Sequence, residues 1–257
     1  MLADSAQIAR TLASGCRPAV VQVAWSPEAW VAPAAVDPVG TPLLLTSDSG
    51  QLNRALSTGN GLDTAVALSF ADEAPVPGAP TYGSAYISGW AERVPAGEVR
   101  QAAVAFCDSY PVVELLDVGD GFGLWRLDVA EVRLADGPDL VDVPVEEYAA
   151  AEPDAWYSLE QELLLDLYDH HPEVLERIAS HVRARDADVR WVTPVRVDSS
   201  GLTVMTRRAG DERDELLAIR LRSDHGDLPG MLHELSCCRC LHAAEIEPVA
   251  QERKAAG

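Results

Sequence analysis

The segment from residue 159 to 222 constrains the fold most, because a helical pattern is followed there by three closely spaced strand patterns. Leu159, Leu163 and Leu167 are four residues apart and predict one apolar helical face. Pro172 is typical of the first position of a second helix. Alternating apolar residues then predict strands near 189–197, 202–208 and 216–222, with a turn at 198–201. A last helix is expected from Asp227 through Leu235. The order αβββα predicts a small domain with helices over one face of a sheet.

The N-terminal half consists mainly of strand patterns with a few short helices between them. In 123–134 the residues alternate, so Leu124, Arg126 and Asp128 share one side of a half-buried strand. The segment 42–47 is apolar enough for a strand buried on both faces. Further strands are predicted at 18–25, 62–70 and 82–94, the last with candidate bulges at Gly83 and Gly89. Short helices are predicted at 4–14, at 98–106, and through Leu56 with a cap from 47–49. This succession predicts a β-barrel rather than a parallel α/β sheet.

Composition limits the classes of partner. The net charge is −21, and such a surface repels phosphate backbones and anionic lipid, so we expect neither nucleic acid nor membrane as partner. No run approaches the roughly 18–20 apolar residues of a membrane span. The N-terminus lacks the pattern of a signal peptide, and a cytoplasmic location is expected. Ten arginines lie between Arg177 and Arg222. They either balance acids on a solvated face or form a local anion site.

Four motifs occur in a characteristic order in the first half of the chain. They are Gly40-Thr-Pro-Leu-Leu-Leu-Thr-Ser47, Ser49 followed by Asn53, the strand 62–70, and Gly89-Trp-Ala-Glu92. With the αβββα segment after them, they resemble the split β-barrel of the pyridoxamine-phosphate-oxidase type followed by a C-terminal domain. HugZ-type haem-utilisation proteins and the plant glutamyl-tRNA-reductase-binding protein have this arrangement.

The resemblance implies an α+β protein with a split barrel at 1–142, a connection at 143–156 and an αβββα domain at 157–257. It also implies a homodimer, because HugZ-type relatives pair their barrels face to face.

In flavin-binding members of the fold, basic and hydroxyl residues near the second and third strands hold the FMN phosphate. The matching residues here are Ser49, Asn53 and Arg54. A flavin phosphate carries nearly two charges and needs fixed cationic partners. Arg54 is the single basic residue between Arg17 and Arg93. FMN is therefore an unlikely cofactor in our interpretation, and flavin-dependent oxidoreductase chemistry is the least favoured function.

Two clusters contain imidazoles. Asp169, His170 and His171 stand at a helix–proline–helix junction, where they either cap helices or act as base or ligand. The second cluster is Cys237-Cys238-Arg239-Cys240-Leu241-His242, whose soft sulfurs and imidazole suit zinc or haem iron. It lacks the second Cys/His pair of a zinc site and the Cys-x-x-Cys-His spacing of covalent haem. Buried thiols at a helix end are the alternative for this cluster.

HugZ-type proteins bind haem with help from a histidine in the C-terminal tail, and His242 has a comparable position. The resemblance thus implies His242 as the haem ligand, with His170 in reserve, and a haem-associated binding protein. Two alternatives remain: a non-catalytic protein that binds a partner enzyme, and an FMN-dependent oxidoreductase. No catalytic residue is assigned. If the protein is an enzyme, the implied reaction is oxidative breakdown of haem.

Overall fold

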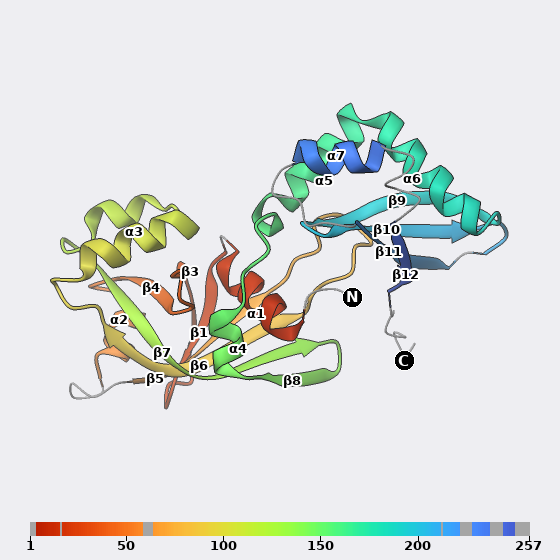
Figure 1. Ribbon diagram of the computed structural model, residues 1–257. Helices are drawn as coiled ribbons and strands as arrows, with labels where there is room; N and C mark the ends of the chain where they lie inside the picture. The colour runs from red at the N-terminus through yellow and green to blue at the C-terminus, as the bar shows by residue number, and fades with distance from the viewer. Residues whose placement is uncertain are drawn as a thin grey trace. The chain divides into compact units, whose positions relative to one another are not determined.

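The computed structural model describes residues 4–15, 17–58, 64–211, 213–221, 228–236 and 244–249. The chain divides into two compact units, the first made of 1–72 and 82–153 and the second of 73–81 and 154–257. The predicted α+β class, a split barrel followed by a smaller αβ unit, is confirmed (Figure 1). The segment 143–156, predicted as a connection, contains helix α4 (Val145–Ala150), whose Tyr148 is buried.

The first unit is built on one curled antiparallel sheet of eight strands. The strand order is β2-β1-β5-β6-β7-β4-β3, and β8 pairs with β7 beside this path. The strands are β1 (Ala19–Val23), β2 (Ala29–Ala32), β3 (Ala34–Val36), β4 (Pro42–Ser47), β5 (Thr64–Ala71), β6 (Ser84–Arg93), β7 (Phe122–Asp136) and β8 (Asp139–Val143).

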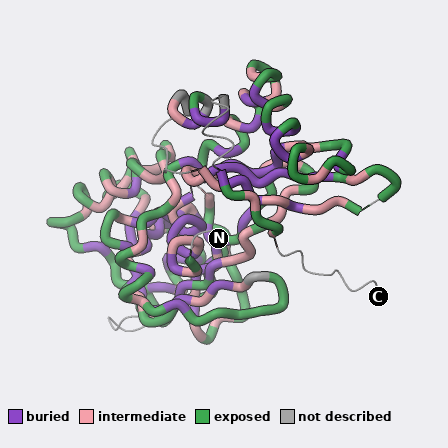
Figure 2. Tube along the Cα trace, turned by 45° about the vertical axis from the view of Figure 1, so that its right-hand side comes forward, coloured by how far each residue is buried: buried purple, intermediate pink, exposed green. Residues whose placement is uncertain are grey.

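Strand β7, which is the predicted strand 123–134, pairs with β4, the predicted strand 42–47. The two therefore lie in one sheet, as the sequence patterns predicted. Leu43 lies opposite Arg126, and Ser47 opposite Phe122. The other edge of β7 pairs with β6 over most of its length. Burial follows the predicted patterns, since β4 is buried at every residue but its last. Figure 2 shows the buried residues of both units in purple.

Gly89 is required at the predicted bulge in β6. The register between β6 and β7 shifts between Ser88 and Gly89. A Cβ at residue 89 would lie 1.9 Å from the carbonyl oxygen of Asp128. Only glycine therefore lets the two backbones approach this closely.

Short helices complete the first unit. Helix α1 (Ser5–Ser14) begins as predicted, with the Asp4 carboxylate accepting from the Gln7 amide. The predicted cap of α2 (Gln51–Leu56) is wrong: the helix begins after Gly50 without a side-chain cap. The hydroxyls of Ser47 and Ser49 instead lie 3.2 Å apart in a hydrogen bond. The remaining helices are α3 (Val99–Ser109) and the 3₁₀ turn η1 (Val113–Asp117).

The second unit has a four-stranded antiparallel sheet in the order β12-β11-β10-β9, with helices over one face (Figure 1). Its strands are β9 (Val189–Asp198), β10 (Gly201–Arg208), β11 (Asp214–Arg220) and β12 (Glu245–Pro248), the last of which the sequence patterns missed. Its helices are η2 (Tyr157–Leu159), α5 (Glu160–His170), α6 (Pro172–Arg185) and α7 (Leu228–Ser236). The predicted cap Asp227 lies outside the described residues. Across the described ranges, no helix is long and apolar enough to cross a membrane.

The buried face of α5 differs from the predicted leucine stripe. Leu164 and Leu167 are buried, whereas Leu159 is 48% exposed. Glu160 takes the place of an apolar residue on the buried face. Its carboxylate accepts from Arg196 Nε at 2.9 Å, from Arg196 Nη2 at 2.6 Å and from the Val197 amide at 2.9 Å. Arg196 Nη1 donates to the Pro80 carbonyl at 2.9 Å, so the pair also holds the 73–81 segment within the second unit.

We predict that Glu160→Ala lowers the free energy of unfolding of the second unit by about 3–5 kcal/mol, because it leaves the Arg196 charge buried without its carboxylate. Urea denaturation followed by circular dichroism measures the change. Glu162→Ala, an exposed position on the same helix, is the matched control and should change stability by less than about 0.5 kcal/mol. A loss at Glu160 below about 1 kcal/mol, the range of a surface pair, would contradict this account.

Candidate functional site

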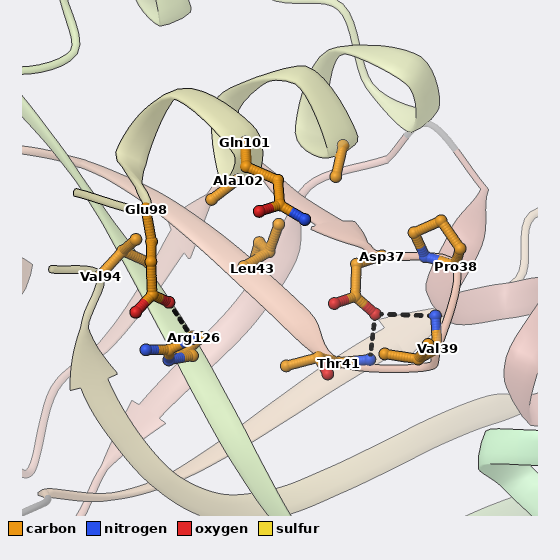
Figure 3. Close-up of a pocket in the computed structure, with 11 residues that line it drawn as sticks. Asp37, Pro38, Val39, Thr41, Leu43, Val94, Glu98, Gln101, Ala102 and Arg126 are labelled. Atoms are coloured by element: carbon orange, nitrogen blue, oxygen red, sulfur yellow. Dashed lines mark hydrogen bonds and ion pairs between the residues drawn. The ribbon is translucent and has the colours of Figure 1, made fainter. Parts of the chain in front are cut away.

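Two hollows in the first unit share Val39, Thr41 and Arg126. The first has a volume of about 340 Å³ and lies between α3 and the turn 37–41. Figure 3 shows it, with Glu98 and Arg126 at one end and Asp37 and Pro38 at the other. The second has a volume of about 450 Å³. Its lining includes Gly40, Trp90, Glu92, Leu127, Asp128, Val129, Val145, Tyr148 and Ala149.

The second hollow lies where β7 changes partner along one edge. The pairing of β7 with β4 ends at Arg126, and its pairing with β8 begins at Val132. Leu127, Asp128 and Val129 lie between these two points and line the hollow, together with residues of α4. A gap between two partner strands, covered by a short helix, therefore forms the hollow.

Arg126 is held between two acids. Its Nη1 donates to Glu98 at 2.8 Å, and its Nε lies 3.5 Å from Glu92, the residue opposite it on β6. The hydrogen bond to Glu98 is the largest cause that raises the pKa of Arg126, and the charges of Glu98 and Glu92 act in the same direction. The three side chains carry a net negative charge, so Arg126 alone is a weak attractor for an anion.

The predicted phosphate site consists of Ser49, which precedes α2, and of Asn53 and Arg54, which lie within it. Asn53 is buried, and its amide bonds the Asp48 carbonyl at 3.0 Å and the Trp125 indole at 3.3 Å. Arg54 is exposed, and its Nε donates to the Gly50 carbonyl at 3.4 Å. Asn53 thus serves the protein's own hydrogen bonds rather than a ligand.

A third hollow of about 350 Å³ lies beside Asn53. Glu114 is the charged residue in its lining, which contains no arginine. The negative charge of Glu114 does not favour binding of a phosphate in this hollow.

His170 and His171 lie where α5 ends and α6 begins. Both pair with Asp166 and not with the neighbouring Asp169: His170 Nδ1 lies 3.1 Å and His171 Nε2 3.3 Å from its carboxylate. His171 occupies the N-cap position of α6, but its side chain makes no capping hydrogen bond. The side chain of His170 is 69% exposed. An imidazole with Nδ1 on a carboxylate keeps Nε2 for a ligand, an arrangement common among metal-binding histidines.

The second predicted cluster, Cys237, Cys238, Cys240 and His242, lies outside the described residues. Within the parts of the chain that are described, no group of three or more His, Cys, Asp or Glu side chains could hold a metal ion by itself.

Half of the arginines in the arginine-rich stretch of the second unit pair with acids. Arg207 pairs with Asp214, Arg208 with Asp186 and Glu215, and Arg220 with Asp198. Arg183 pairs with Glu176, in addition to the buried Arg196 pair. Five of the ten arginines thus support the interpretation that this stretch balances acids on a solvated face, rather than the alternative of an anion site.

No family model and no curated protein sequence matches the chain. Among solved structures, it is similar to a haem-binding protein from Mycobacterium smegmatis, with 20% identity and a TM-score of 0.66 over 92% of this chain and 97% of that one. A protein of unknown function from Agrobacterium tumefaciens matches with 15% identity and a TM-score of 0.43 over 91% and 96% of the two chains. The first likeness covers both units and shows that the fold is shared.

Sequence patterns alone missed the residues that line the two main hollows. Arg126 was recognised as part of an alternating strand, and Trp90 as part of a motif, but neither as part of a site. The signal that could have linked Arg126 to a site is the register of β6 on β7, which places Glu92 opposite it. Tyr148 was missed because its segment was taken for a connection.

Proposed function

We propose that this protein is a haem-associated binding protein. The observation that carries the proposal is the likeness to a haem-binding protein along nearly the whole chain, at a TM-score of 0.66. Haem activates oxygen at its iron when bound, and the protein would supply binding, orientation and an axial ligand.

The hollows around Arg126 fit part of what a haem site requires. Ligand sites of small molecules commonly measure roughly 300–1,000 Å³ and have mainly apolar walls. Both hollows fall in this range. Leu127, Val129 and Val145 give the second hollow apolar walls, and Trp90 adds an aromatic ring. Arg126 would hold a propionate, with Glu92 and Glu98 limiting its strength.

The candidate axial ligands are the histidines that the sequence singled out. All six histidines of the chain lie at or after residue 170, so residues 1–169 contribute no imidazole. His242 is the preferred ligand because it stands in the tail beside soft sulfurs. His170 is the alternative, and its Asp166 partner would orient its ring and strengthen it as a donor.

We predict that hemin binds reversibly and that His242→Ala shifts the Soret band, because loss of an imidazole changes the ligand field of the iron. Spectra of wild type, His242→Ala and His170→Ala at equal hemin concentrations test this. His233→Ala, an exposed position on α7, is the control and should leave the spectrum unchanged. Identical spectra and affinities in all four proteins would mean that neither histidine is the ligand. Absence of binding above a non-specific control would refute the haem proposal.

A second observation supports a protein partner, first of all another copy of this chain. The outer face of the barrel sheet is apolar and exposed: Val31 is 71%, Val20 45% and Tyr86 41% exposed. The cross-strand pairs Val20↔Val31, Val20↔Ser69 and Ser69↔Tyr86 place these residues in one row. The next row contains Gln22, Ala67 and Ser88, so the face combines apolar and polar groups. A self-complementary face of this kind suits a two-fold dimer.

We predict that the wild-type protein has about twice the 27.6 kDa mass of one chain in solution. Val20→Glu combined with Val31→Glu should give monomers, because the change buries like charges in the proposed interface. Light scattering after size exclusion measures the mass. Val104→Glu, at a 56% exposed position on α3, is the control and should remain dimeric. A monomeric wild type would contradict the dimer and favour the alternative of a different partner protein.

A further inference from the structure

Arg10 is a buried cation without a carboxylate partner. It lies on α1 and is 3% exposed. Its Nη2 donates to the carbonyls of Asp37 at 2.7 Å and Pro38 at 3.2 Å, while Nε and Nη1 have no hydrogen-bond partner. Among the described residues, none forms an ion pair with it. Buried charges are normally paired, because a charge removed from water needs compensation.

Tyr148 lies against the same guanidinium and is also incompletely bonded. The carbon of the Arg10 guanidinium lies 5.5 Å from the centre of the Tyr148 ring. The Tyr148 hydroxyl is buried, and its proton has no acceptor among the described residues. Burial raises the pKa of Tyr148 to about 12, against the opposing effects of the Arg10 charge and of a side-chain hydrogen bond from Arg10. The hydroxyl therefore stays protonated at ordinary pH and can donate.

The one acid that influences this pair is already engaged. Asp37 is close enough to raise the pKa of Tyr148. Its Oδ1 accepts from the amides of Val39 at 3.0 Å and Thr41 at 2.8 Å, which fixes the turn (Figure 3). Arg10 binds the main-chain oxygen of Asp37 and not its carboxylate, so the donors Nη1 and Tyr148 Oη remain unmatched.

These donors adjoin the second hollow. Gly40 and Tyr148 both line it, and Arg10 lies directly behind Gly40. A Cβ on Gly40 would stand 2.9 Å from Arg10 Nη1, and the backbone there has φ of +99°, which favours glycine. The absence of a side chain at residue 40 thus leaves room for the guanidinium behind the turn, where Nη1 is buried.

We propose that the second hollow binds the carboxylate of a small apolar monoanion, with Arg10 Nη1 and the Tyr148 hydroxyl as its donors. A carboxylate supplies both the missing negative charge and the missing acceptors. Leu127, Val129 and Val145 would contact its apolar body. Glu92 and Asp128 in the lining repel a dianion and so favour a single charge. In the absence of a ligand, Arg10 Nη1 and the Tyr148 hydroxyl are covered by protein atoms. Binding would therefore require a small displacement of the Gly40 turn.

This inference goes beyond the proposed function, because it concerns a carboxylate and not iron, and it stands whether or not haem binds. Octanoate and its neutral analogue octanamide are suitable probes, since they share an apolar chain and contain no metal.

Calorimetric titration of wild type should show octanoate binding at least about tenfold more tightly than octanamide, the ratio expected for one charge-assisted hydrogen bond to a buried cation. Tyr148→Phe should reduce this preference by about tenfold. Its melting temperature without ligand should stay equal or rise, because the proton of the deleted hydroxyl had no acceptor. Arg10→Met should abolish the preference. Tyr110→Phe, at a partly buried position directly after α3 and outside the lining of both hollows, is the matched control and should alter neither quantity.

Three results would overturn the proposal. The first is equal binding of the two probes, or binding of neither. The second is an unchanged preference in Tyr148→Phe. The third is a marked fall in the melting temperature of ligand-free Tyr148→Phe, which would show that a bound water already satisfies the hydroxyl. If Arg10→Met does not fold, the Tyr148→Phe results decide alone.

Discussion

The pairing of strand β7 determines most of what the first unit can do. One edge of β7 pairs with β6, while the other pairs with β4 up to Arg126 and with β8 from Val132. The interval between these partners leaves backbone and side chains of β7 to be covered by other elements. Helix α4 and the turn 37–41 provide that cover, and the second hollow forms between them. The site therefore follows from a long strand that has two successive neighbours on one side.

Local sequence patterns predicted five of the eight barrel strands, because these five have a clear apolar pattern, whereas the short strands β2, β3 and β8 were missed. The buried strand 42–47, the alternating strand 123–134 and the bulge at Gly89 were all evident before the structure. Strand β12 was missed because its four residues are too few for a recognisable pattern. The burial of Glu160 was also missed, because a charged residue is expected on the exposed face of a helix. Only the distant Arg196 makes its burial favourable, and that pairing cannot be inferred from local spacing.

The candidate site was predicted less completely than the fold. Ser49 precedes α2 and Asn53 and Arg54 lie within it, but Asn53 serves the protein's own hydrogen bonds. His170 has a carboxylate partner, although Asp166 takes the place of the adjacent Asp169. Arg10, Tyr148 and Gly40 come from three distant segments, and their association depends on the packing of α1 against α4. Long-range contacts of this kind leave no mark on sequence spacing.

The haem proposal rests on the likeness of the fold, on the hollows around Arg126 and on histidines that all lie at or after residue 170. The absorption spectrum of the protein purified from haem-replete cells tests this account most directly. The account predicts a Soret band that strengthens when hemin is added, without flavin bands. Flavin bands in the purified protein, or no Soret band even with hemin in excess, would contradict it.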